Sequence, residues 1–283
     1  MSPRIHSFRF LTERRSLAFG VVLMFCCLSF AQQPVTLPDE RQAFRSLALG
    51  VGNAASLDTY LSPNEYSGPF VSVDLDRISC ISSDSFIPYR RLFLSLGGSS
   101  MRNHAGAYNT VNLMAHGYYS FSHPLVRNEH WDCLLGASVL TDLGALYNSM
   151  NSNNPVNAQF QNSFGATLDN IYRFRLLRRP MVAKATVHLP LIGTSFAPDN
   201  DQLYWNMYQE SDLDGNFHYV TPFSAQTGAA QVSLAIPLHK NVFQIGYNLY
   251  LMRNRLGGNS ANLLHSYVTL GFVYRSEKLS WRQ

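Results

Sequence analysis

Hydrophobic and polar side chains alternate along the C-terminal part of the chain. In one run Phe243, Ile245, Tyr247, Leu249 and Leu251 share a parity, opposite Gln244, Gly246 and Asn248. In the next run Val268, Leu270, Phe272 and Tyr274 lie opposite His265, Tyr267, Thr269 and Gly271. Each run has about the length that a tilted strand needs to cross a bilayer, and the polar segment RNRLGGNSAN joins them. The pattern predicts a membrane-spanning β-hairpin.

The same alternation recurs upstream and predicts an all-β chain. The apolar parities centre on residues 47–51, 71–75, 92–96, 111–121, 131–139, 158–174, 181–189 and 230–236. Together with the last hairpin they give about ten strands, and an extra hairpin within 158–224 gives twelve as the alternative. In a closed antiparallel transmembrane barrel the first strand pairs with the last, so no sheet edge is left unpaired in the lipid.

The connections between these strands differ in length on the two sides of the barrel. With a periplasmic N-terminus, the segments 54–67, 101–107, 146–156, 193–222 and 255–262 fall on the outer side, and we expect them to be the long loops. The turn at Pro88, the turn at Pro124 and the turn at 177–180 lie on the other side and are mostly shorter.

The N-terminus has the organisation of a secretory leader. Arginines occupy the first 15 residues, an apolar run spans 16–28, and Ser29 and Ala31 stand at the −3 and −1 positions before Gln32. The apolar run is too short for a helical span. We therefore expect a signal peptide at 1–31 and one outer-membrane β-barrel domain at 32–283.

Composition is compatible with such a barrel. Of the 283 residues 46% are hydrophobic and 14% charged, and the mean hydropathy of −0.09 is what a wall with one apolar and one polar face gives. The net charge of +4 comes partly from arginines in the leader, and we expect no nucleic acid partner. Outside the leader Cys80 and Cys133 remain, which either form one disulfide or stay unpaired.

A short motif follows the first predicted strand. It reads D-T-Y-L-S-P-x-x-Y-x-G and comprises Asp58, Thr59, Tyr60, Leu61, Ser62, Pro63, Tyr66 and Gly68. After a signal peptide and an N-terminal strand, this motif resembles an uncharacterised family of outer-membrane β-barrels from Bacteroidota, classed as a domain of unknown function. The resemblance implies a location in the cell outer membrane and a barrel fold, and it implies no activity.

The inward parity predicts a polar lumen. It collects Asp74, Asp76, Asn112, His116, Asp132, Asp142, Asp169, Lys184, His188, Gln231, Asn248 and His265. A ten-stranded barrel is narrow, so we interpret these residues as a filled polar core whose charges satisfy one another. The alternatives are a conducting or a catalytic site. The sequence contains no H-x-x-x-H or H-x-H pair of the kind that binds a metal ion, and we expect no cofactor.

Three function classes follow from these patterns. The first is a structural or surface-binding role, in which outer loops such as 54–67 and 193–222 contact an extracellular ligand or protein. The second is a transport channel for small solutes or lipids, which requires a gap along the lumen. An outer-membrane hydrolase is third, because His265 and Ser266 face opposite sides of their strand. We expect that the protein is no enzyme and that its constant partner is outer-membrane lipid.

Overall fold

The computed structural model describes residues 44–80, 87, 89–106, 108–177, 179–199, 202–210, 214–238 and 241–275. The chain divides into two compact units, Met1–Pro34 and Val35–Gln283, and all described residues belong to the second. Its elements are β1 (Phe44–Asp58), β2 (Ser62–Cys80), β3 (Tyr89–Asn103), β4 (Asn109–Arg127), β5 (Trp131–Asn148), β6 (Val156–Leu176), β7 (Arg179–Phe196), α2 (Tyr204–Glu210), η3 (Asp214–Asn216), β8 (Phe217–Val220), β9 (Ala225–Leu238), β10 (Asn241–Leu256) and β11 (Asn259–Arg275). The predicted signal peptide at 1–31 and the predicted turn at Pro88 lie outside the described residues.

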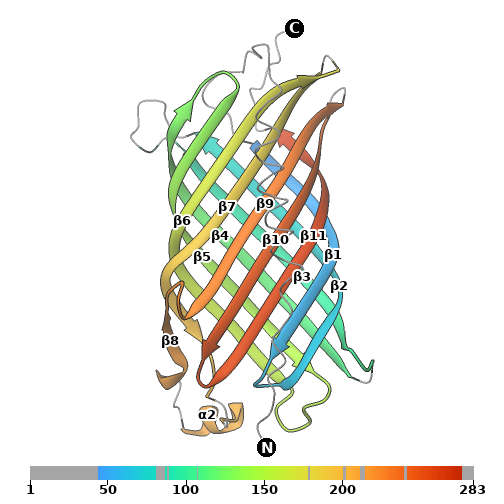
Figure 1. Ribbon diagram of the computed structural model, residues 1–283, viewed down its shortest axis with the longest axis vertical. Helices are drawn as coiled ribbons and strands as arrows, with labels where there is room; N and C mark the ends of the chain where they lie inside the picture. The colour runs from blue at the N-terminus through green and yellow to red at the C-terminus, as the bar shows by residue number, and fades with distance from the viewer. Residues whose placement is uncertain are drawn as a thin grey trace, which may run out of the picture. The chain divides into compact units, whose positions relative to one another are not determined.

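The strands form a closed antiparallel barrel (Figure 1). Neighbours in the wall follow the order β6-β5-β4-β3-β2-β1-β11-β10-β9-β7, and pairing of β6 with β7 closes the ring. β8 pairs only with the last residues of β7, so ten of the eleven strands make the wall. The predicted pairing of the first strand with the last is confirmed from Phe44↔Arg275 to Asp58↔Ala261. The ten-strand prediction is confirmed, and the twelve-strand alternative is wrong.

The two faces of the wall follow the predicted parity. Large apolar side chains cover the outside, and the most exposed of them are Leu49, Val51, Leu96, Leu113 and Phe164. Val51, for example, is 66% exposed, and its cross-strand partners Val71 and Val268 are also exposed. A surface of this kind is stable only against lipid, so this apolar belt marks the membrane-spanning part of each strand.

The strands continue beyond the apolar belt at one end. We call the end where β1 begins and β11 finishes the terminal end, and the opposite end the far end. At the far end the predicted long loops 54–67 and 255–262 are wrong, because β1 and β2 are joined by residues 59–61, and β10 and β11 by Gly257 and Gly258. Outside the belt the strand residues become polar, and the alternation that locates a membrane strand fades while the backbone ladder continues.

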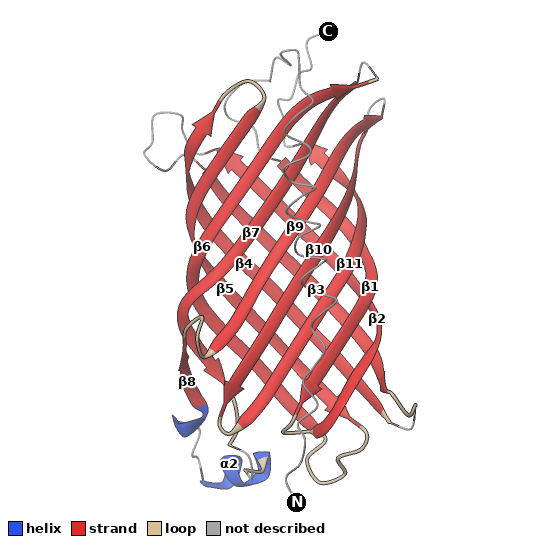
Figure 2. Cartoon of the chain, in the orientation of Figure 1, coloured by secondary structure: helices blue, strands red, loops and turns tan. Residues whose placement is uncertain are grey.

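The far end carries the described helical segments (Figure 2). The connection 197–224 between β7 and β9 contains α2, η3 and β8, so the long loop predicted at 193–222 is confirmed in place and is partly ordered structure. The loops predicted at 101–107 and 146–156 shorten to 104–108 and 149–155. Among the described residues no helix is long and apolar enough to cross a membrane.

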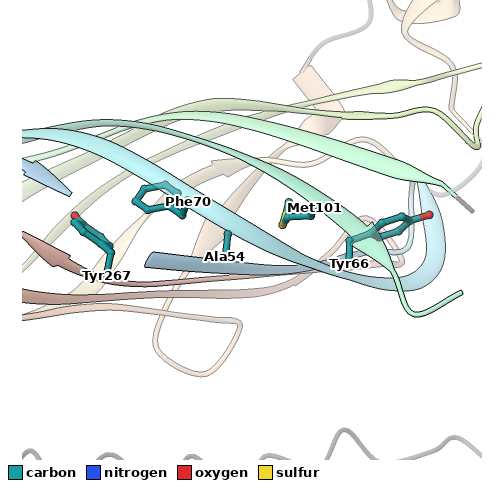
Figure 3. Close-up of a cluster of buried hydrophobic side chains, with 5 residues drawn as sticks. All are labelled: Ala54, Tyr66, Phe70, Met101 and Tyr267. Carbon is teal, nitrogen blue, oxygen red and sulfur yellow. The ribbon is translucent and has the colours of Figure 1, made fainter. Parts of the chain in front are cut away.

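Aromatic and sulfur side chains pack against the inner wall. Figure 3 shows Tyr267, Phe70, Ala54, Met101 and Tyr66 following one another along the wall, and all five are buried. They come from β1, β2, β3 and β11, the strands on both sides of the pairing between β1 and β11. Packing of this cluster therefore stabilises the junction of the first and last strands.

Candidate functional site

The structure turns all seven candidate lumen residues toward the interior. Asp74, Asp76, His116, Asp132, His188 and His265 are buried, and the side chain of Lys184 is 16% exposed. They divide into four groups: an ionic network, a layer of histidines and aromatic rings, the hydrogen bonds of Asp74, and the pair of Asp132 with Arg173 on β5 and β6.

The ionic network centres on Arg91 of β3, which is 2% exposed. Its guanidinium binds Asp76 of β2 in a bidentate arrangement, with Nε 2.8 Å from Oδ1 and Nη2 3.0 Å from Oδ2. Such paired hydrogen bonds fix both direction and distance. Lys184 of β7 donates to the same carboxylate, so Asp76 joins two cations.

The same guanidinium reaches the other side of the barrel. Its Nη1 donates to Asp169 and Thr186, and its Nη2 donates to Gln231 Oε1 at 2.7 Å. Tyr118 lies under it, with 5.4 Å from Cζ to the ring centre. One side chain thus bonds to β2, β6, β7 and β9, and two carboxylates offset the charges of Arg91 and Lys184.

The prediction from sequence missed Arg91. It has the parity of the inward residues Phe93 and Ser95, and this parity was the signal that could have found it. Its position close to the turn at Pro88 hides that signal, because the regular alternation of Leu92, Leu94 and Leu96 begins only after it.

Histidines and aromatic rings fill the interior next to the network. His116 donates from Nδ1 to Asp142 Oδ1 at 2.5 Å, and Tyr250 donates to Asp142 Oδ2 at 2.9 Å. His188 stacks on Tyr118 with ring centres 4.9 Å apart, and His265 stacks on Phe70 at 4.2 Å. The rings therefore interlock, as the filled-core interpretation expects.

Asp74 belongs to a separate set of hydrogen bonds. It accepts from Ser95 Oγ at 2.6 Å and from Asn248 Nδ2 at 2.8 Å. These partners come from β3 and β10 and are neutral. Asp74 is thus a hydrogen-bonded structural carboxylate rather than a member of the ionic network.

Empty space lies on both sides of this filled part. The far-end cleft, with about 480 Å³ of empty space that is partly open to solvent, is lined by residues from Asp58 and Tyr60 at the rim to Asp142 at its floor. Two inner cavities, with about 430 and 320 Å³ of empty space that is also partly open to solvent, reach Asp76 and Lys184. No described lining residue is common to the cleft and either inner cavity.

The motif residues form the turn at the rim of the far-end cleft. Asp58 closes this turn, because its carbonyl accepts from Leu61 N and its Oδ1 accepts from Tyr60 N, each at 3.1 Å. Thr59 ties the turn to the neighbouring hairpin through Ser260, whose N–H donates to Thr59 Oγ1 at 2.9 Å.

The second half of the motif fixes the start of β2. Ser62 Oγ accepts from Asn64 N at 3.2 Å and from Tyr66 O–H at 3.1 Å. At Gly68 a Cβ atom would lie 2.1 Å from the carbonyl oxygen of Ser100, so the close approach of β3 requires glycine. Pro63 is exposed and Leu61 is buried in this turn.

Asp58 and the segment around α2 meet over the cleft. Asn157 Nδ2 donates to Asp58 Oδ2 at 2.7 Å, and Tyr204 of α2 donates to Asn157 Oδ1 at 2.8 Å. Tyr60 donates to the carbonyl of Gln202 at 2.7 Å. Beyond the belt, burial raises the pKa of Asp58 to about 6, and the hydrogen bonds from Asn157 and Tyr60 offset part of that effect. Burial also raises the pKa of Tyr204.

Other sequence expectations concern cysteine and serine. The structure contains no disulfide between Cys80 and Cys133, which lie on β2 and β5. His265 is buried inside the barrel, whereas Ser266 lies on the outer face with its Oγ 2.7 Å from the hydroxyl of Tyr247. The two side chains do not form a nucleophile and base pair.

Comparison with solved structures finds other barrels. The chain is similar to the outer membrane protease OmpT from Escherichia coli, with 8% identity, a TM-score of 0.45, and coverage of 85% of this chain and 99% of that one. It is similar to the translocator domain of the autotransporter NalP from Neisseria meningitidis, with 9% identity, a TM-score of 0.36, and coverage of 93% and 96%. It is also similar to the COG4313 outer membrane channel from Pseudomonas putida F1, with 11% identity, a TM-score of 0.34, and coverage of 88% of this chain and 100% of that one. All three TM-scores lie below 0.5.

Sequence comparison places the chain in a family. No curated protein matches it. One family model, however, matches residues 20–283, nearly the whole chain. The chain therefore belongs to the family described as protein of unknown function (DUF3316).

Proposed function

We propose that this protein is an outer-membrane β-barrel with a closed lumen, whose far end faces the outside of the cell and binds a ligand. The observation that carries the closed lumen is the bonding of Arg91 to β2, β6, β7 and β9 across the interior. The apolar belt supports the membrane location. The motif at 58–68 is the basis for assigning the source to Bacteroidota.

Binding at the far end rests on the cleft and no longer on extended loops. The turn 59–61 is too short to form the contact surface expected at 54–67. The cleft, by contrast, is concave and has polar groups on several elements, which is the usual form of a small-molecule site.

A catalytic role is disfavoured by burial. Ser138 and Thr167 both contact Nδ1 of His188, at 3.1 and 3.0 Å, and this is the described Ser–His contact closest to a hydrolase arrangement. His188 is 0% exposed, however, and it stacks on Tyr118, so a substrate has no approach to it. We propose that the protein is no enzyme.

Transport is the second candidate, favoured by the cavities on both sides of the filled part. Single-channel recording in planar lipid bilayers distinguishes a transport channel from a barrel with a closed lumen. We expect no conductance steps from the wild-type protein. The double variant Arg91→Ala with Tyr118→Ala lacks the side chains at the centre of the ionic network and should give conductance steps. These steps would show that the barrel inserts into the bilayer. Steady conductance of the wild-type barrel would overturn the closed lumen and favour transport.

A further inference from the structure

The far-end cleft is lined by hydrogen-bond acceptors that lack donors. Gln159 Oε1, Asn254 Oδ1 and Asn259 Oδ1 are buried without a hydrogen-bond partner, and their side chains are at least nine-tenths buried. They come from β6, β10 and β11, so three separate strands present an acceptor to the cleft. A buried polar atom without a partner destabilises the folded protein, because its hydrogen bond to water is lost and not replaced. A ligand that donates several hydrogen bonds removes that cost.

The charge of the cleft is negative. Asp58 and Asp142 are its ionisable carboxyl groups, and no Lys, Arg or His is among the described residues that line it. Asp142 already accepts from His116 and Tyr250 at the floor. Asp58 accepts from two neutral donors, Asn157 and the backbone of Tyr60, and no cationic side chain pairs with it among the residues that the structure describes.

From the unpaired acceptors and the uncompensated carboxylate, we infer that the far-end cleft binds a small organic cation, an ammonium or guanidinium compound with several N–H donors. This inference rests on the proposed ligand-binding function of the far end. It names the chemical class, which the proposed function leaves open.

Isothermal titration calorimetry of the full barrel in zwitterionic detergent at constant ionic strength tests the class. The probes are 1,4-diaminobutane, its neutral counterpart 1,4-butanediol, and CaCl2. We expect saturable 1:1 binding of the diamine and no heat of binding from the diol or from Ca²⁺. Equal binding of diol and diamine, or binding of Ca²⁺ alone, would overturn the inference.

Two variants locate the binding. Asp58→Asn should weaken diamine binding about tenfold or more, because a charge-assisted hydrogen bond is lost. Glu65→Gln is the matched control: Glu65 lies on the outer face of β2 opposite Leu57, so it removes the same charge from the same region outside the cleft. If Asp58→Asn does not fold, Gln159→Leu serves instead, with several-fold weakening expected. An equal effect of the cleft and control variants would contradict the site.

The outcomes separate this inference from the proposed function. If the same wild-type preparation conducts and also binds the diamine, the proposal of a closed lumen is wrong and the inferred cation site stands. If the wild type binds only the neutral probe and does not conduct, the inference of a cationic ligand is wrong and the proposal of a closed, ligand-binding barrel stands.

Discussion

At the scale of single residues, Asp58 combines a structural role in the turn with an unusual titration. Its carboxyl group is buried beside neutral donors, and this burial raises its pKa from the ordinary value of 3.8 to about 6 in the folded protein. The folded state therefore holds the proton more tightly than the unfolded state. Stability from this group is present below about pH 4 and is lost as the pH rises to about 6.

Substitution of Asp58 should therefore change the pH dependence of folding. Between pH 4 and pH 7 the wild type should lose of the order of 2 kcal/mol of unfolding free energy relative to Asp58→Asn, which keeps an acceptor at Oδ1 and cannot ionise. Urea titrations in lipid vesicles at both pH values measure this difference. A constant difference between the two proteins across that range would contradict the assigned titration.

The last strand, β11, provides a test of which side chains face the lipid and which face the interior of the barrel. Leu270 is 51% exposed on the apolar belt, whereas Thr269 is buried and lines the inner cavity that Asp74 also lines. Leu270→Arg should cost about 2–4 kcal/mol of folding free energy near the bilayer midplane. Thr269→Arg should cost less, because Asp74 and Asp76 line the same cavity and their carboxylates can pair with the introduced guanidinium. Folding into vesicles across a urea series measures both, and the reverse order of costs would mean that the faces are exchanged.

At the scale of elements, the segment around α2 is held to the barrel by a few named contacts. The hydroxyl of Tyr60 donates to the carbonyl of Gln202 and accepts from Asn154. Tyr60→Phe removes both bonds without removing the ring. With about 1 kcal/mol per hydrogen bond, opening of the segment should become roughly fivefold more frequent or greater.

Limited proteolysis of protein inserted in vesicles measures that opening. Cleavage within 197–224 should accelerate in Tyr60→Phe. Tyr219→Phe is the control, because Tyr219 lies in the same segment and is 85% exposed. If both variants are cleaved at the wild-type rate, the Tyr60 contacts do not hold the segment.

The elements also show what a sequence pattern can and cannot predict. Alternation predicted the wall, the closing pair and the face of every candidate lumen residue, since burial on one side and lipid on the other impose a period of two. It failed at 54–67, where Ser56, Asp58 and Ser62 extend the strands with polar side chains. It could not show that Gln159, Asn254 and Asn259 meet in one cleft, because that requires the spatial register of three strands.

At the scale of the whole molecule, the proposed orientation can be read from the two ends. Phe223 at the far end is 98% exposed, and Leu177 at the terminal end is 88% exposed. In a background with Cys80→Ser and Cys133→Ser, Phe223→Cys should react with a membrane-impermeant maleimide on intact cells. Leu177→Cys should react only after the outer membrane is permeabilised. Labelling of Leu177→Cys alone on intact cells would reverse the orientation.

The wide separation along the chain of the partners of Arg91 affects how the barrel assembles. Its contacts join residues 15, 78, 95 and 140 positions apart, so they form only after most strands have been synthesised and inserted. Until then the guanidinium and its carboxylate partners need water, and a partly inserted sheet must keep a hydrated inner face. Drying of the interior is therefore a late event that coincides with ring closure. Because loop closure over such distances is slow, the final seal of the barrel is a kinetic step distinct from the insertion of its hairpins.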